Sequence, residues 1–167
     1  LLTYAFEVLT KAECEPQNIV LAVKILSECA GGGGMVGGQV LDIENENKTA
    51  DLDTLLEIHK KKTGALICAA CKLGCVAAGK TDDITLSAAE KYAIDLGTAF
   101  QIIDDILDEK GESAVLGKTV GKDKKSGKTT FLSFFDMKNA EKYAEDLTKE
   151  ATDALACFSC DKILYDL

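Results

Sequence analysis

Apolar residues recur every three or four positions along most of this chain, which is the spacing of amphipathic α-helices. The clearest stretch covers residues 84–107, and no segment shows the alternation of a β-strand. The glycines at 31–34 interrupt the pattern that begins at Pro16, and the Gly- and Lys-rich residues 110–128 indicate a loop. We therefore predict an all-α fold, with helices over residues 1–9, from 16 to the glycines, and over 35–43, 51–60, 63–78, 84–107 and 131–158.

Length and composition favour one globular domain without an internal linker. The chain has 167 residues, of which 47% are apolar and 28% charged, enough for a packed core. The net charge of −9 argues against a nucleic-acid partner, because phosphate binding needs a basic face. No run reaches the roughly 20 apolar residues of a membrane span, and no signal-peptide pattern is visible, so we expect a cytoplasmic protein.

Seven cysteines favour free thiols in a reducing compartment, because their number is odd and no secretory signal accompanies them. Cys68, Cys71 and Cys75 fall on one helical stripe, and Cys157 and Cys160 repeat the three-residue step. A structural zinc site needs a turn between paired cysteines, and neither pair has a Gly or Pro there. We expect these cysteines to be buried core thiols.

Carboxylates gather within residues 100–108, near the end of the longest predicted helix. Asp104 and Asp108 are one turn apart, and Gln101 and Asp105 complete this face. The helix dipole disfavours each anion there by about 0.3–1 kcal/mol, and repulsion between like charges adds to that cost. The arrangement favours bound cations, and open carboxylate sites with room for water and phosphate suit Mg²⁺. For this motif alone, a solvated acidic helix end remains the alternative.

Four ordered segments carry a family resemblance. Residues 100–108 match a Phe-Gln-x-x-Asp-Asp-x-x-Asp motif, and residues 34–42 match a Gly-Gly-Gln-x-x-Asp helix. Residues 59–66 contain Lys-Thr-Gly-x-Leu, and residues 116–130 form a Gly- and Lys-rich loop. Together they resemble the trans-isoprenyl diphosphate synthases, over essentially the whole chain. The resemblance implies a bundle of long antiparallel helices around a central cavity, and a homodimer.

The resemblance also implies an enzyme that condenses isopentenyl diphosphate with an allylic diphosphate, dimethylallyl or geranyl diphosphate. In this family three Mg²⁺ ions bridge two aspartate motifs to the allylic diphosphate. The C–O bond ionises, the double bond of isopentenyl diphosphate attacks the cation, and a proton is lost. Farnesyl diphosphate is the expected product, although the residues that largely set product length precede the first aspartate motif and are not in this chain.

Site residues are carried over by motif match. Asp104 is implied as the most direct metal ligand, supported by Asp105 and Asp108. The single His59 is expected to pack or to form a hydrogen bond rather than to bind metal, and a solvated lysine face is the alternative for residues 60–62. The remaining implied roles are diphosphate binding by Lys62, Lys118 and Lys128, oxygen dipoles turned towards the cation by Thr63 and Gln101, and water-mediated contacts to the metals by Gln39 and Asp42.

The chain departs from the family by lacking the first aspartate motif and any Arg. Phe131-Leu132 also stands where Tyr-Pro is common, which bears on Lys128. We interpret residues 1–167 as the C-terminal part of a single synthase domain whose first half lies upstream, with a genuine half-length polypeptide as the alternative. The sequence also leaves open a non-catalytic regulatory subunit of a prenyl synthase, and a helical metal-binding or scaffold protein.

Overall fold

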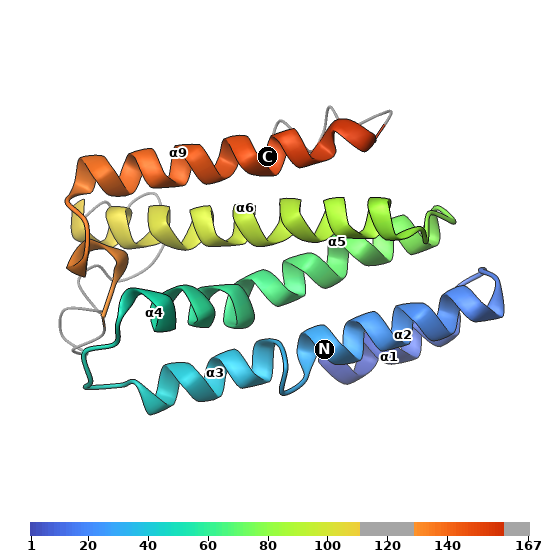
Figure 1. Ribbon diagram of the computed structural model, residues 1–167. Coiled ribbons are helices and arrows are strands. Elements are labelled where there is room, and N and C mark those ends of the chain that lie inside the picture. The colour runs from blue at the N-terminus through green and yellow to red at the C-terminus, as the bar shows by residue number, and fades with distance from the viewer. Residues whose placement is uncertain (111–128, 159–167) are drawn as a thin grey trace.

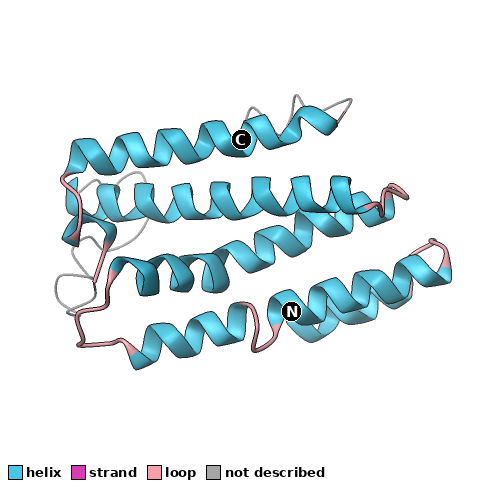
Figure 2. Cartoon of the chain, viewed as in Figure 1, coloured by secondary structure: helices cyan, strands magenta, loops and turns pink. Residues whose placement is uncertain are grey.

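The computed structural model describes residues 1–110 and 129–158, and every regular element within them is helical (Figure 2). This confirms the predicted all-α class. In chain order the elements are α1 (Leu2–Thr10), α2 (Pro16–Ala30), α3 (Met35–Glu44), α4 (Leu52–His59), the π turn η1 (Lys60–Gly64), α5 (Ala65–Ala77), α6 (Asp83–Lys110), the 3-10 turn η2 (Phe131–Ser133), α9 (Met137–Ala154) and the 3-10 turn η3 (Leu155–Cys157).

The long helices run antiparallel to one another, as the colour sequence of Figure 1 shows. α2 and α3 form one row, α4 to α5 return in the opposite direction, α6 runs back, and α9 returns along it. The end of α3, the start of α4, the end of α6 and the start of α9 therefore meet at the same end of the molecule. The predicted acidic motif, on α6, lies at that end.

Polar caps determine where two of these helices begin. Asp51 caps α4 and Asp136 caps α9, each by accepting a hydrogen bond from the backbone N–H three residues later, at 2.8 and 2.9 Å. Because α9 begins after Asp136, the prediction of one helix over residues 131–158 is wrong at its start. Phe131–Ser133 form a separate 3-10 turn, closed by a capping box at Thr130.

A π turn joins α4 to α5 into one continuous helical rod. We predicted two helices, over residues 51–60 and 63–78, and the break between them is wrong. The backbone of the rod is wound more widely in the segment Lys60–Gly64, where it forms a π-helix. Short π segments inside α-helices are frequent at functional sites, and this one contains Lys62 and Thr63.

Apolar clusters hold the layer of helices together. One cluster joins α1, α2 and α5, and another joins α4, α6, η2 and α9. Phe131 is fully buried in the second cluster and stacks on Phe135, with ring centroids 4.8 Å apart. The buried members of this second cluster are Leu55, Ala99, Ile102, Ile106, Phe131, Ala140 and Ala144.

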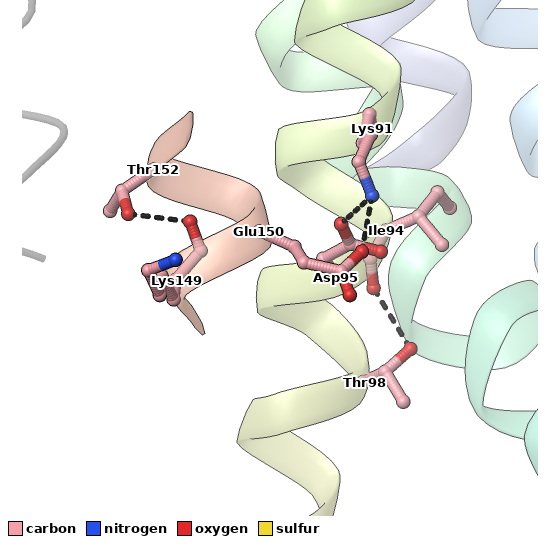
Figure 3. A network of polar contacts seen from close by, with 7 residues as sticks. All are labelled: Lys91, Ile94, Asp95, Thr98, Lys149, Glu150 and Thr152. Carbon is pink, nitrogen blue, oxygen red and sulfur yellow. Dashed lines mark hydrogen bonds and ion pairs between the residues drawn. The ribbon is translucent and has the colours of Figure 1, made fainter. Parts of the chain in front are cut away.

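An ion-pair bridge links α6 to α9 at their surface. Lys91 Nζ lies 2.8 Å from both Asp95 Oδ2 and Glu150 Oε2 (Figure 3). The hydrogen bonds to Asp95 and then to Glu150 raise the pKa of Lys91. Exposed ion pairs contribute little to stability, so packing in the apolar cluster, rather than this bridge, accounts for the pairing of the two helices.

Residues Pro16–Glu44 are long and apolar enough to cross a membrane by length and composition, the one such stretch within the described ranges. A core helix passes the same test, so a single match is weak support for a span. The stretch is divided into α2, of 15 residues, and α3, of 10. Each is shorter than the roughly 20 residues that a span requires.

Cysteine burial agrees only in part with the prediction of core thiols. Cys68 and Cys75 are buried, Cys71 is half-buried, and Cys157 is exposed. The prediction is therefore wrong for Cys157, which lies in η3 at the edge of the bundle. Cys160 lies outside the described residues. The six cysteines that the structure describes are free thiols.

Candidate functional site

The acidic face forms the last turns of α6. Gln101, Asp104, Asp105 and Asp108 are all half-buried there. Within residues 1–110 and 129–158, no three His, Cys, Asp or Glu side chains converge on a common point that would hold a metal. Mg²⁺ is commonly held by one or two carboxylates with water and substrate phosphate. The carboxylate and amide oxygens of this face are donors of the kind that Mg²⁺ accepts.

Asp105 connects the end of α6 to the chain that follows residues 111–128. Its Oδ2 accepts a hydrogen bond from Phe131 N at 2.7 Å. Next to this contact, Thr129 Oγ1 accepts a hydrogen bond from Ala50 N at 3.1 Å. Asp105 thus fixes one root of the predicted lysine loop. Lys118 and Lys128, the two loop lysines predicted for the site, lie outside the described residues.

Lys62 and Asp42 meet although 20 residues separate them. Lys62 Nζ lies 2.6 Å from Asp42 Oδ2, and the two side chains are 35% and 16% exposed. Lys60 is exposed, as the solvated-lysine interpretation implies, whereas Lys61 and Lys62 are half-buried. Gln39, one turn before Asp42 on α3, is exposed. An ammonium held by one carboxylate is positioned to exchange that partner for another anion, such as a phosphate.

Glycines allow the π turn to lie very close to both neighbouring helices. A Cβ at Gly38 of α3 would lie 2.7 Å from Lys62 Cα, and even closer to Lys62 N. On the other side, a Cβ at Gly97 of α6 would lie 3.0 Å from Gly64 Cα. Gly97 is one turn before Gln101, so along the helix axis η1 crosses α6 about 10 Å from Asp104 and about 16 Å from Asp108. The segment with Lys62 and Thr63 is therefore wedged between α3 and the acidic helix.

His59 lies directly before the π turn and is only 8% exposed. Burial lowers its pKa to about 4; the positive charge of Lys62 adds to this shift, whereas Asp42 opposes it. Its Nε2 has no hydrogen-bond partner among the described residues. A neutral, buried imidazole agrees with the prediction that His59 is a packing residue. The sequence signal for this prediction was the helical spacing of His59 with Leu52, Leu55 and Leu56.

Sequence reasoning missed two contacts of this region. One is the hydrogen bond between Asp105 and Phe131 N, and the other is the ion pair between Lys62 and Asp42. Both join segments that are distant in sequence, so local spacing carries no signal for them. The adjacent glycines Gly37 and Gly38, within the motif of residues 34–42, are the sequence feature that could have signalled the close approach of α3 to another backbone.

Comparison with known proteins finds prenyl diphosphate synthases and related prenyltransferases. The family model described as "Polyprenyl synthetase" matches residues 1–159. Farnesyl diphosphate synthase of Escherichia coli (strain K12) is 41% identical over 158 residues, covering 93% of this chain and 53% of that protein. Dimethylallyltranstransferase of Fischerella ambigua is 41% identical over 161 residues, covering 95% of this chain and 46% of that protein.

Solved structures give the same picture. A geranyltransferase from Helicobacter pylori, complexed with magnesium and isoprenyl diphosphate, superposes with a TM-score of 0.83 at 34% identity. The match covers 98% of this chain and 54% of that one. The chain thus spans about half the length of the curated relatives and structures that it matches.

Proposed function

The chain belongs to the polyprenyl synthetase family, and from that premise we propose that its polypeptide is a short-chain prenyltransferase. The reaction joins isopentenyl diphosphate to an allylic diphosphate, with farnesyl diphosphate as the product. The relatives' names support this choice, since they include farnesyl diphosphate synthase and dimethylallyltranstransferase. Geranylgeranyl synthases also occur among them, so a longer product is the second candidate.

One observation carries the proposal. The π turn with Lys62 and Thr63 is packed against α6 one turn before Gln101, with no Cβ between Gly64 and Gly97. Lys62, proposed here to bind phosphate, and the carboxylates of α6, proposed to bind metal, therefore lie on two helical elements that are in direct contact. Diphosphate ionisation needs this combination, because charge develops on the leaving group and must be neutralised as it forms.

Specific roles follow from this placement. Asp104 is proposed as the most direct ligand of Mg²⁺, which would supply Lewis-acid stabilisation of the leaving diphosphate, and Asp108 acts with it through water. Lys62 leaves Asp42 to bind the allylic diphosphate, and Asp42 remains as a water-mediated acceptor. The other proposed contributions are oxygen dipoles from Thr63 and Gln101, a water contact from Gln39, and diphosphate binding by Lys118 and Lys128.

Three Mg²⁺ ions, a homodimer and a cytoplasmic location complete the proposal. The ion count comes from the family resemblance, while the oxygen donors on α6 support magnesium in general. The homodimer comes from the family resemblance. Exposed apolar side chains on α1 and α2, among them Tyr4, Val8 and Val20, are available to an interface, either with a second subunit or with the rest of the domain.

The test is product analysis with the polypeptide as it occurs in the cell. It is supplied with Mg²⁺, isopentenyl diphosphate and geranyl diphosphate, and the products are identified by mass spectrometry beside those of Asp104→Ala. A fifteen-carbon diphosphate that the variant forms at least about 100-fold more slowly, the scale of losing a key electrostatic contact, supports the proposal. No product despite binding of diphosphate and Mg²⁺ would indicate a regulatory subunit.

A further inference from the structure

A polar groove lies between α2, α4, η1, α5 and α6. It has a volume of about 460 Å³, and its walls include Cys29 and Cys68 together with Lys72 and Glu90. Of the described residues predicted for prenyl transfer, none lines this groove. Gly34, Lys60 and Lys61 of the family motifs do line it, but the two thiols have no part in the proposed reaction.

The two thiols come from adjacent helices and act on each other. Cys29, on α2, is half-buried, and Cys68, on α5, is 4% exposed. The Cys68 side chain is the largest influence on Cys29 and lowers its pKa to about 7, with Lys72 adding to the effect. The same interaction, followed by burial, raises the pKa of Cys68. Burial, Glu90 and Glu28 act against the Cys29 thiolate.

Lys72 takes part in an ion pair at the wall of the groove. It forms an ion pair with Glu90 of α6, and its side chain is 20% exposed. Lys72 and Glu90 line the groove together with both cysteines, and the positive charge of Lys72 acts to lower the pKa of each thiol. A half-buried thiol beside a cation is the setting in which cysteines become nucleophiles.

We propose that Cys29 and Cys68 form a reactive thiol pair that is oxidised by low-molecular-weight disulfides. The Cys29 thiolate attacks the S–S bond of a small disulfide RSSR, forming a mixed disulfide and releasing RS⁻. Cys68 then loses its proton, attacks the sulfur of Cys29 and releases the second RS⁻. Two protein thiols are oxidised to one disulfide between α2 and α5, and RSSR is reduced to two RSH, so electrons and protons balance.

The first test measures which thiol reacts. The reduced, folded polypeptide is treated with limiting iodoacetamide from pH 5 to 9, and each cysteine is quantified by peptide mass spectrometry. Cys29 is expected to label half-maximally near pH 7, and faster at neutral pH than Cys14, a half-buried cysteine outside the groove. Lys72→Met should slow the labelling of Cys29 at pH 7 without slowing that of Cys14. Equal labelling of Cys29 and Cys14 would overturn the proposal.

The second test follows the oxidation itself. With oxidised glutathione, intact mass and peptide mapping should show a Cys29–Cys68 disulfide without bound glutathione. Cys68→Ser should stop at a glutathione adduct on Cys29, and Cys29→Ser should leave Cys68 reduced. Cys14→Ser is the matched control and should behave as the unaltered protein does. A glutathione adduct that persists on Cys29 while Cys68 is intact would refute the assignment of Cys68 as the resolving thiol.

Discussion

Among single residues, Asp105 belongs to the acidic motif of residues 100–108 and also forms a hydrogen bond that holds another part of the chain in place. Its carboxylate accepts a hydrogen bond from Phe131 N at 2.7 Å, and Phe131 is fully buried. A buried N–H that loses its acceptor costs about 1–3 kcal/mol. Asp105 therefore acts as a positioning residue for the chain that returns from residues 111–128, beside any water-mediated contact to metal.

Replacing Asp105 separates these two roles. Asp105→Ala should destabilise the protein by about 1–3 kcal/mol and accelerate amide exchange at Phe131, because the N–H loses its acceptor. Asp105→Asn retains an amide oxygen, so it should preserve most of this protection while it removes the negative charge. Chemical denaturation and hydrogen exchange measure the two effects. Unchanged exchange at Phe131 in the alanine variant would show that the contact does not anchor the loop root.

His59 is expected to make stability depend on pH. Burial lowers its pKa from 6.5 to about 4, so the unfolded chain binds a proton at a pH where the folded protein does not. The stabilisation is complete above pH 6.5 and is lost as the pH falls towards 4. At pH 5 the loss is about 2 kcal/mol, at roughly 1.4 kcal/mol per unit.

His59→Gln provides the comparison, because a glutamine does not titrate. Urea denaturation at pH 7 and pH 5 should show the unaltered protein losing about 2 kcal/mol more than the variant. Carboxylates titrate in both proteins, so the difference isolates the imidazole. Parallel losses in the two proteins would mean that His59 titrates in the folded state as it does in the unfolded chain.

For single residues, sequence reasoning predicted the helix face on which a side chain lies better than it predicted which distant residue the side chain contacts. It put Asp104, Asp105 and Asp108 on one helix face and His59 on an apolar face, since both follow from 100° steps along a helix. It had no means of pairing Lys62 with Asp42, because the chain turns between them. The roles of the aspartates in binding metal stay predictions.

At the scale of elements, α3 and the π turn are packed so closely that only glycine fits between them. A Cβ at Gly38 would lie 2.7 Å from Lys62 Cα, and both atoms belong to helical backbones that do not move independently. Gly38→Ala should therefore destabilise the protein by about 1–3 kcal/mol, the cost of overpacking, and displace Lys62 from Asp42.

Gly74→Ala is the matched control for Gly38→Ala. Gly74 also lies in a helix, α5, but nothing lies within 4 Å of a Cβ placed there, so alanine should stabilise by about 0.5–1 kcal/mol. Thermal denaturation gives the sign of each change. Similar shifts for both variants would show that helix propensity, not the close approach of α3 to η1, dominates at Gly38.

Most helices were predicted correctly from the spacing of apolar residues. The errors lie at helix boundaries, where capping residues and a π turn decide where a helix begins or ends. The predicted helix over residues 131–158 failed at its start because Asp136 caps α9 and Thr130 closes a separate 3-10 turn. The predicted break near residues 60–63 failed because the polar lysines and Gly64 are accommodated by a π turn. That turn depends on Gly38 and Gly97 in neighbouring helices, which local pattern does not encode.

At the scale of the whole molecule, the antiparallel layer gathers the ends of α3 and α6 and the start of α4 on one side (Figure 1). The apolar cluster around Phe131 and Ile102 makes α4, α6 and α9 a single unit. Ligands bound at this end therefore contact elements that unfold together, so their binding energy should appear in the global stability of the protein.

This linkage separates a prenyl synthase from a scaffold that merely binds metal. Mg²⁺ and inorganic diphosphate, added together, should raise the free energy of unfolding by more than the sum of their separate effects, because each would complete the other's coordination. At 100 times the apparent Kd the gain is about 2.7 kcal/mol. Asp104→Asn should abolish the excess, whereas Asp146→Asn, an exposed carboxylate on α9, should retain it. Additive effects would favour the scaffold, since a protein without a diphosphate substrate has no reason to couple the two ligands.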